Sequence, residues 1–391
     1  MAERSKQLIT LSLALLLLGG CVSGTTAYFR KIDADIDGIM RGKYPVSDSI
    51  GKDVNCYRFD YDGVGKLLKI KYLRSAISEL SDLPYGATQV RFKYSDESEK
   101  KIFLNSRGKV IGFECLELRN NQPVTISSYG STGNLDERYA LIRNENGQVS
   151  RINFLNEKDD RISNTEGFYE VRYRYDNRGN KSEVSFCAAD GQRQEIEGLG
   201  FAIAQYEYDD YGNTVEERFY GADEKPKEIK GDGAALVSST YDGNGNIIER
   251  RQYGIDGKLK ENRSGRAFWR FKYNDRGDRV EVKCYGANEQ LNEGKAGWAI
   301  LRLTYDYKKN HQESRFYGAD GTPKSNSMGT AILLNQYDPN GNQKETRFLG
   351  INGQLKENNK RVAIIRYEYD QEGKETKTIY FDRNGRVIKE E

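Results

Sequence analysis

A motif recurs about every 32 residues along most of this 391-residue chain, and this period constrains the fold more than any other feature. Each copy ends an apolar, aromatic-rich segment, and successive copies lie 32 or 33 residues apart. The end residues are Leu155, Cys187, Tyr220, Tyr253, Tyr285, Tyr317, Leu349 and Phe381. Shorter, less regular copies precede them, which makes about eleven units over residues 56–391. A period of this length predicts units that stack on their neighbours and bury a shared core.

Each unit has the pattern of a β-hairpin. In residues 201–221, one alternating segment ends at Tyr208 and a second follows Asn213. Between them, Asp at the first position and Gly at the fourth are typical of a type I turn that closes with a left-handed residue. The turn glycines are Gly179, Gly212, Gly245, Gly277, Gly341 and Gly373. Lys309 stands in the glycine position of one unit, which predicts a more strained turn there.

The two strands of each hairpin carry different side chains in register. Ala202 and its equivalents lie six residues before the turn tyrosine, so they share its face of the sheet. After the turn, Glu249 and Arg251 and their equivalents share one face, which we interpret as solvated and register-setting. The fold class that follows is all-β: a repetitive antiparallel β-hairpin array, an extended or winding sheet or solenoid, with little helix.

The N-terminus has the features of an export signal. Arg4 and Lys6 precede an apolar run from Leu8 to Leu18, which is too short to span a bilayer as a helix. The following Leu18-Gly19-Gly20-Cys21 resembles the lipobox of bacterial lipoproteins. The resemblance implies cleavage after Gly20, with diacylglycerol and an N-acyl chain on Cys21 as a membrane anchor. Val22 in place of Asp favours the outer membrane; an ordinary secretion signal with an incidental cysteine is the alternative.

These patterns divide the chain into four parts. We expect a lipoprotein signal peptide at residues 1–20 and a lipid anchor with its tether at 21–54. Shorter, degenerate β-hairpin repeats follow at 55–165, and regular 32-residue repeats at 166–391.

The motif Tyr-Asp-x-x-Gly-Asn, at 175–180, 241–246 and 337–342, resembles the YD repeat of Rhs-like bacterial surface proteins. The resemblance implies a winding antiparallel β assembly outside the cytoplasm. Rhs proteins often enclose a C-terminal toxin, but here the repeat runs to Gly385, so we do not expect a toxin-delivery role.

Few residues suggest a reaction or a bound cofactor. His311 is the one histidine of the chain, and no nucleophile with a recognisable base or phosphate-binding loop stands out. Asp33, Asp35 and Asp37 with Gly38 match the start of a calcium-binding loop, but Tyr44 replaces its final Glu, so an acidic turn is favoured. Cys187 and Cys284 fill slots that hold apolar residues in sister units, so small apolar filling is their expected role. We therefore expect no enzyme and no cofactor beyond the lipid on Cys21.

Function is predicted by class. The chain has 61 Lys and Arg against 59 Asp and Glu, which argues against nucleic acid as a partner. We expect a lipid-anchored envelope or surface protein that acts as a non-catalytic binding or structural module. Its partners are then the membrane and a protein or glycan ligand of the envelope. The alternatives are an accessory factor of an envelope assembly or secretion system, and an envelope glycan-active hydrolase.

Overall fold

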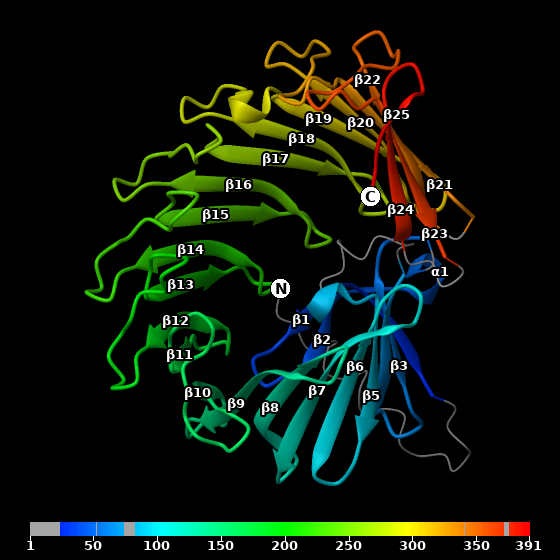
Figure 1. The fold of residues 1–391 in the computed structure, drawn as a ribbon. Coiled ribbons are helices and arrows are strands. Elements are labelled where there is room, and N and C mark those ends of the chain that lie inside the picture. Colours follow the sequence, from blue (N-terminus) through cyan, green and yellow to red (C-terminus); the bar gives the residue numbers. More distant parts are fainter. Residues whose placement is uncertain (1–23, 52, 74–82, 340, 371–374) are drawn as a thin grey trace.

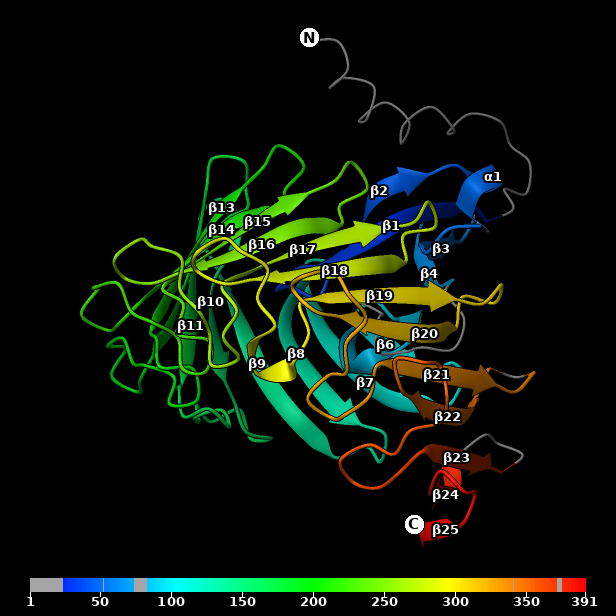
Figure 2. The ribbon, with the colours of Figure 1, turned by 90° about the horizontal axis from the view of Figure 1, so that it is seen from above.

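One continuous antiparallel sheet makes up almost all of the computed structural model, which describes residues 24–51, 53–73, 83–339, 341–370 and 375–391. Its described part has 25 strands: β2 lies at one edge, β1 comes next, and β3 to β25 follow in chain order. The sheet winds from β3–β8 through β10–β14 to β17–β25 (Figures 1 and 2). The predicted all-β hairpin array is confirmed.

The irregular N-terminal part holds ten strands and a short helix. They are β1 (Thr26–Ala34), β2 (Met40–Val46), α1 (Asp48–Gly51), β3 (Tyr57–Tyr61), β4 (Leu67–Tyr72), β5 (Gln89–Tyr94), β6 (Ser98–Leu104), β7 (Val110–Arg119), β8 (Gln122–Gly130), β9 (Leu135–Arg143) and β10 (Val149–Phe154). A 3₁₀ turn, η3, covers Pro84–Gly86.

The regular repeats form seven successive hairpins and a last strand. They are β11 (Glu170–Tyr175), β12 (Lys181–Cys187), β13 (Ile203–Tyr208), β14 (Thr214–Tyr220), β15 (Leu236–Tyr241), β16 (Ile247–Tyr253), β17 (Phe268–Tyr273), β18 (Arg279–Tyr285), β19 (Ile300–Tyr305), β20 (His311–Tyr317), β21 (Ile332–Tyr337), β22 (Gln343–Leu349), β23 (Ile364–Tyr369), β24 (Glu375–Phe381) and β25 (Val387–Glu390). A second 3₁₀ turn, η4, covers Gly294–Ala296. None of the described helices is long and apolar enough to cross a membrane.

The hairpin turns have the geometry that the sequence predicts. In the β13–β14 turn, Gly212 N donates to Asp209 O at 3.1 Å, and Asp209 N donates to Asn213 O at 3.0 Å. Asp209 also accepts hydrogen bonds from the Tyr211 and Asn213 amides at 2.9 Å, which explains why Asp opens these turns. Gly179, Gly212, Gly245, Gly277 and Gly341 all have positive φ, and so does Lys309 at 70°. Gly373 lies outside the described residues.

A hydrogen bond from a tyrosine hydroxyl to a backbone carbonyl connects each repeat to the one before it. The Tyr208 hydroxyl donates to Lys181 O at 2.8 Å, and the Tyr273 hydroxyl donates to Ile247 O at 3.0 Å. Tyr175, Tyr241, Tyr305, Tyr337 and Tyr369 make the same bond in their units. The tyrosine that precedes each turn therefore joins consecutive hairpins, and its recurrence needs no ligand to explain it.

Two faces of the repeat sheet can be distinguished by composition. The aromatic face carries the alanine and tyrosine slots, and the charged face carries Glu249, Arg251 and their equivalents. Glu249 accepts from Arg251 and from Arg270 of the next hairpin, each at 2.6 Å. The Arg270 bond joins neighbouring hairpins, as expected of a register-setting face. The expectation that this face is solvated is wrong in part, because the equivalent Glu183 and Glu345 are buried.

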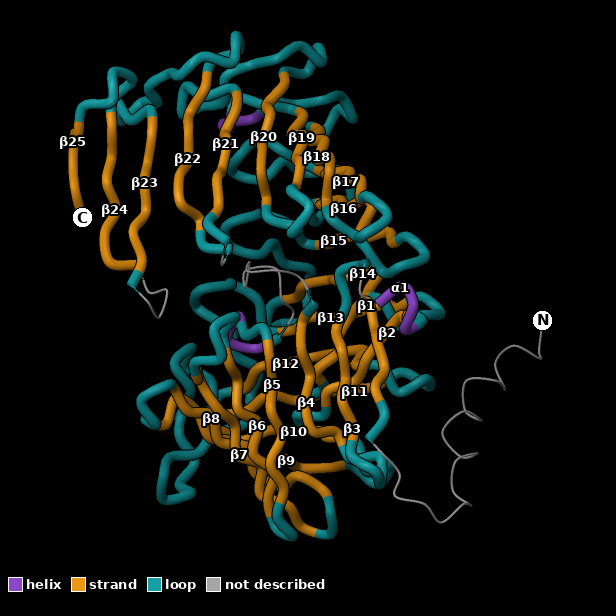
Figure 3. Tube along the Cα trace, turned by 90° about the vertical axis from the view of Figure 1, so that its right-hand side faces the viewer, coloured by secondary structure: helices purple, strands orange, loops and turns teal. Residues whose placement is uncertain are grey.

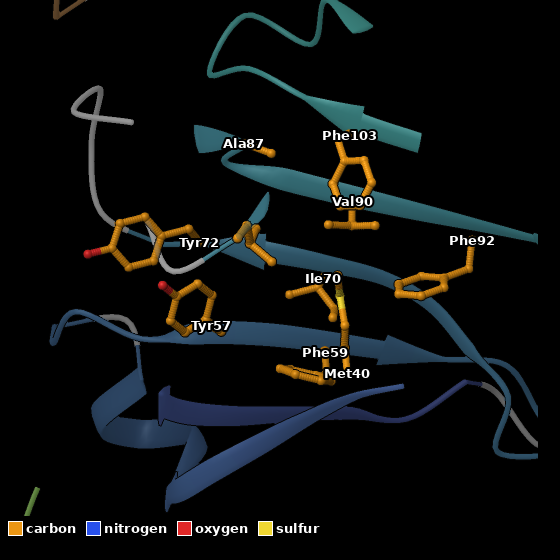
Figure 4. Packing of buried hydrophobic residues seen from close by; sticks show 10 residues of the cluster. Met40, Tyr57, Phe59, Ile70, Tyr72, Ala87, Val90, Phe92 and Phe103 are labelled. Atoms are coloured by element: carbon orange, nitrogen blue, oxygen red, sulfur yellow. The ribbon is translucent and has the colours of Figure 1, made fainter. Parts of the chain in front are cut away.

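The tether that we expected over residues 21–54 is wrong for its described part. Residues 26–46 form the β1–β2 hairpin, which pairs with β3. Its turn at Asp35–Gly38 has the hydrogen bonds of the repeat turns, with Gly38 N donating to Asp35 O at 2.9 Å. Met40 of this hairpin also joins the buried cluster of Tyr57, Phe59, Ile70 and Val90 (Figure 4). Burial of this apolar surface keeps the segment folded on the sheet.

The winding brings the turns of the regular repeats against the N-terminal strands (Figure 3). Asn55 Nδ2 donates to the fully buried Asp278 at 2.8 Å, and Asn55 N donates to Arg276 O at the same distance. At the turn between β21 and β22, Arg107 of the N-terminal part donates to Asn342 at 2.6 Å. The turns of several repeats therefore share one contact surface with the N-terminal part.

Candidate functional site

A pocket of about 480 Å³ opens where the β1–β2 hairpin meets the aromatic face of the repeats. Its lining combines basic and aromatic side chains from segments far apart in the sequence: Lys31, Ile32, Asp33, Lys43, Tyr44, Asn213, Thr214, Tyr241, Gly245, Ile247, Arg250, Phe271, Tyr273 and Arg279. We call it the hairpin pocket. Without the β1–β2 hairpin one wall would be absent, so the docking of this hairpin creates the site.

Two residues of β2 connect this hairpin to the repeat turns. Lys43 Nζ lies 3.1 Å from Asp33 Oδ2 and donates to Gly212 O at 3.1 Å. The Tyr44 ring stacks on Tyr211, with 6.2 Å between the ring centroids. It also lies so close to Gly245 that a Cβ there would come within 2.3 Å of the ring. Gly245 therefore has two roles: it adopts φ 77° in its turn, and it leaves room for Tyr44.

The opposite wall consists of rings held in place by the fold. The Tyr241 and Tyr273 hydroxyls are bonded to the carbonyls of Thr214 and Ile247, so their orientation is fixed. The Arg279 guanidinium lies 4.6 Å from the centroid of the Phe271 ring, which is a cation–π distance. The wall therefore offers half-buried ring surfaces beside a cation, with little freedom to rearrange.

The charge of the pocket is positive. Four bases line it, Lys31, Lys43, Arg250 and Arg279, whereas Asp33 is its one carboxylate among the described residues. Burial raises the pKa of Tyr44, and the Asp209 and Asp242 carboxylates add to this effect. Its phenol therefore stays neutral. Rings beside cations suit a ligand with a flat or sugar-like surface and an anionic group.

Two other hollows, of about 460 and 450 Å³, lie on the charged face between β9 and β14. The first is lined by Arg151, Arg172, Arg174 and Arg193 with Glu183. Carboxylates of the fold already occupy these arginines: Arg151 and Arg172 pair with the buried Glu170, Arg174 with Glu183, and Arg193 with Glu224. We therefore assign these hollows to the register-setting face.

A row of polar side chains crosses β6 to β9, with Lys101 buried and the others partly buried. Lys101 is fully buried and donates to Glu114 at 3.0 Å, and Ser128 and Glu137 continue the same register. Burial raises the pKa of Glu137, and it raises that of Glu99 in spite of the nearby Lys101. The β1–β2 turn covers this row, since a Cβ on Gly38 would lie 2.5 Å from Lys101 Nζ. The row is therefore part of the interior and not of a ligand pocket.

The three aspartates that match a calcium loop do not converge. Asp33 pairs with Lys43 at 3.1 Å, Asp35 with Arg41 at 3.1 Å, and Asp37 lies 3.8 Å from Arg143. Within the described residues, no group of His, Cys, Asp or Glu has the arrangement of a metal site. Asp35 and Gly38 instead close the β1–β2 turn.

The cysteines and the histidine considered from the sequence have these positions. Cys21 lies outside the described residues. Cys187 and Cys284 are fully buried free thiols, as expected of small apolar filling. His311 begins β20, where its ring contacts Ser314 and the Glu313 carbonyl. Sequence reasoning missed the hairpin pocket, because its walls are joined only by the winding of the sheet.

No protein-family model matches this chain, and no curated protein does. Among solved structures, the TcdB2-TccC3-Cdc42 complex aligns with 95% of this chain and 19% of its own, at 11% identity and a TM-score of 0.29. A Tc holotoxin pore from Photorhabdus luminescens aligns with 93% of this chain and 17% of its own, at 11% identity and a TM-score of 0.30. A porin-like protein from Bacteroides uniformis aligns with 68% of this chain and 95% of its own, at 9% identity and a TM-score of 0.28. The chain spans about a fifth of the length of the first of these, and at such TM-scores the likeness carries no argument about function.

Proposed function

We propose that this chain is a lipid-anchored protein of the bacterial cell envelope that acts as a non-catalytic binding module. The export signal and Leu18-Gly19-Gly20-Cys21 support the anchor, and Val22 supports the outer membrane. The hairpin pocket is the observation that carries the binding role, because the fold assembles it from distant segments and holds its side chains rigidly.

The chemistry of the hairpin pocket favours an acidic glycan as ligand. The rings of Tyr241, Phe271 and Tyr273 offer flat surfaces for sugar rings, and Arg279 offers a partner for a carboxylate. Arg250 adds positive charge but already lies 3.7 Å from Glu217. Glycoside hydrolysis generally uses two carboxyl groups, whereas this lining has Asp33 alone, already paired with Lys43. Binding without hydrolysis is therefore the better-supported role.

The anchor is tested with Cys21→Ser in the whole chain. The parent protein should partition into detergent and show the mass of an acylated chain that begins at Cys21. The variant should be unacylated and partition into the aqueous phase. The same mature mass and detergent partition for both proteins would refute the lipid anchor.

The ligand is tested by titrating the unlipidated mature chain with hexuronic acid oligosaccharides. Neutral hexose oligosaccharides of equal length serve as the control. The acidic ligands should bind, and both Phe271→Ala and Arg279→Ala should weaken binding by about tenfold, as expected for loss of roughly 1–2 kcal/mol of ring or charge contact. Arg263→Ala, an exposed change outside the pocket, should have no effect. Equal binding of acidic and neutral ligands, or no effect of either pocket variant, would contradict this ligand class.

An accessory role in envelope assembly is the second candidate, favoured by β25. This strand pairs with β24 on one side, and among the described residues no strand pairs with its other side. Val387 and Ile388 on it are 53% and 46% exposed. A free strand edge can accept a partner strand. Replacing Ile388 by Pro should abolish such a partnership and leave glycan binding intact.

A further inference from the structure

One face of the N-terminal strands is strongly basic. In β3 to β6, Phe59, Ile70, Val90 and Phe103 point into the cluster of Figure 4, so the residues that alternate with them point away from it. On that opposite side lie Arg58, Lys69, Lys71, Arg91, Lys93 and Lys100. We call these six residues the basic face. Asp60 is the one acidic residue of β3 to β6 on the same side.

The arrangement of these charges does not favour folding stability. Arg58 lies directly opposite Lys71, and Lys93 lies directly opposite Lys100. Like charges opposite one another in a sheet destabilise it. Asp60 already forms ion pairs with Arg58 at 2.6 Å and with Lys69 at 3.0 Å, so it does not neutralise the other four bases. Like charges also lie opposite one another in the repeats, as Arg270 and Lys283 do, but there each base has its own carboxylate: Arg270 lies 2.6 Å from Glu249 and Lys283 lies 3.6 Å from Glu281. The basic face therefore points to an external anion.

Much of this surface is open to solvent. Lys71, Arg91 and Lys93 are exposed, whereas Arg58, Lys69 and Lys100 are partly buried. Besides Asp60, Glu99 lies next to Lys100 in sequence but on the opposite side of the sheet, and Asp96 and Glu97 lie on the turn after β5. A flat, exposed array of bases on adjacent strands suits an extended anionic surface better than a small ion.

The chain enters the fold at this same face. Thr26, the first residue of β1, pairs with Asp60, and its hydroxyl donates to Asp60 Oδ1 at 3.2 Å. One residue earlier, Thr25 O accepts a bond from Tyr61 N at 2.8 Å. Cys21 precedes Thr26 by five residues. Five residues span at most about 18 Å, so a lipid on Cys21 keeps the basic face close to the membrane surface.

We propose that the basic face lies on the anionic phospholipid headgroups of the membrane in which the lipid of Cys21 is anchored. This orientation rests on the proposed lipidation of Cys21. The lipid and the basic face then act as two membrane signals, and the second orients the molecule as well as holding it. With strands β3 to β6 in contact with the bilayer, the repeats would have a fixed orientation relative to the membrane.

The test uses the mature chain with Cys21→Ser, so that no lipid contributes to binding. It is sedimented with vesicles of phosphatidylcholine and with vesicles of phosphatidylcholine mixed with phosphatidylglycerol. We expect binding to the mixed vesicles, and we expect it to weaken as salt rises, because screening shortens the reach of the charges. No binding to the mixed vesicles, or equal binding to both kinds, overturns the proposal.

Two matched triple variants locate the interaction. Lys71→Glu, Arg91→Glu and Lys93→Glu together reverse the exposed part of the basic face. Lys225→Glu, Lys258→Glu and Lys344→Glu reverse three exposed lysines of the repeats, with the same change in net charge. Each base near an anionic leaflet contributes about a fivefold gain in partition, equivalent to roughly 1 kcal/mol. The first variant should therefore lose about a hundredfold or more, and the second far less; equal losses overturn the proposal.

Failure of this proposal is distinguishable from failure of the lipid anchor. If the parent chain shows no acyl mass at Cys21, the proposed function fails, whatever the vesicles show. If the acyl mass is present but the unlipidated chain ignores anionic vesicles, the anchor stands and the orientation by the basic face is wrong.

Discussion

Glycine at the fourth position of the repeat turns has two separable effects. Gly179 has φ 86°, and a Cβ there would meet Gln148 Nε2 at an ordinary 3.7 Å. Gly179→Ala should therefore cost backbone strain alone, about 1–2 kcal/mol. Gly245→Ala should cost more, because its Cβ would also displace the Tyr44 ring. Denaturant midpoints measure both, and equal losses would mean that Tyr44 does not pack on Gly245.

Lys309 shows how a non-glycine residue is retained at such a position. Its amide donates to Asp306 O at 3.0 Å, as the glycines do in sister turns, so the predicted strained turn is present. Its Nζ reaches the carbonyls of Val54 and Leu73 at 3.4 Å, which are contacts that no glycine can make. Side-chain contact with the N-terminal part therefore offsets part of the strain.

A pair of variants separates these two contributions at Lys309. Lys309→Met keeps the strain and loses the ammonium group, whereas Lys309→Gly loses both. The glycine variant should therefore be more stable than the methionine variant by about 1 kcal/mol, the cost of a left-handed non-glycine residue. Unfolding free energies from urea titration measure the difference. A methionine variant as stable as the glycine variant would argue against strain in this turn.

At the scale of elements, the ion pairs of the charged face couple stability to pH. Glu345 is buried, which acts to raise its pKa, but its bonds to Arg366 at 2.6 Å and Arg347 at 2.5 Å outweigh burial and lower it. A carboxyl whose pKa is lower in the folded state stabilises the fold above its unfolded pKa. That contribution is lost as pH falls through the lowered value.

Glu345→Gln should therefore lower the unfolding free energy at neutral pH by about 1.5–3 kcal/mol, the usual contribution of charge-assisted hydrogen bonds. The difference from the parent should shrink as pH falls from about 6 toward 3, because glutamate normally titrates near pH 4.3. Glu368→Gln, an exposed change on the neighbouring strand, is the control. A difference that does not change with pH would contradict the ion-pair account.

The sequence predicts the regular hairpins well, because each is specified locally. Asp209 and Gly212 define their turn, and strand alternation places Glu249 and Trp269 on opposite faces without reference to distant residues. The β1–β2 hairpin was predictable too, since Asp35-Ile36-Asp37-Gly38 carries the same turn signature. The calcium-loop interpretation obscured that signal, and the polar composition of residues 21–54 suggested a tether.

At the scale of the whole molecule, the site was not predictable from local patterns. Tyr44 and Gly245 are joined by the winding of the sheet, which depends on the twist that accumulates over many strands. A near-zero net charge likewise hides the basic face, because its six bases are balanced by acids elsewhere in the chain. Both features depend on long-range placement and not on spacing within a unit.

The central claim is that residues 26–46 are docked on the repeat turns and so complete the hairpin pocket. Hydrogen exchange of the intact mature chain tests it most directly, because it reports protection of each backbone amide. We expect amides of residues 26–46 to exchange as slowly as those of β3, and Gly245→Ala to speed their exchange while leaving β21–β24 unchanged. Exchange over 26–46 at the rate of an unstructured peptide would contradict the docked hairpin and with it the pocket.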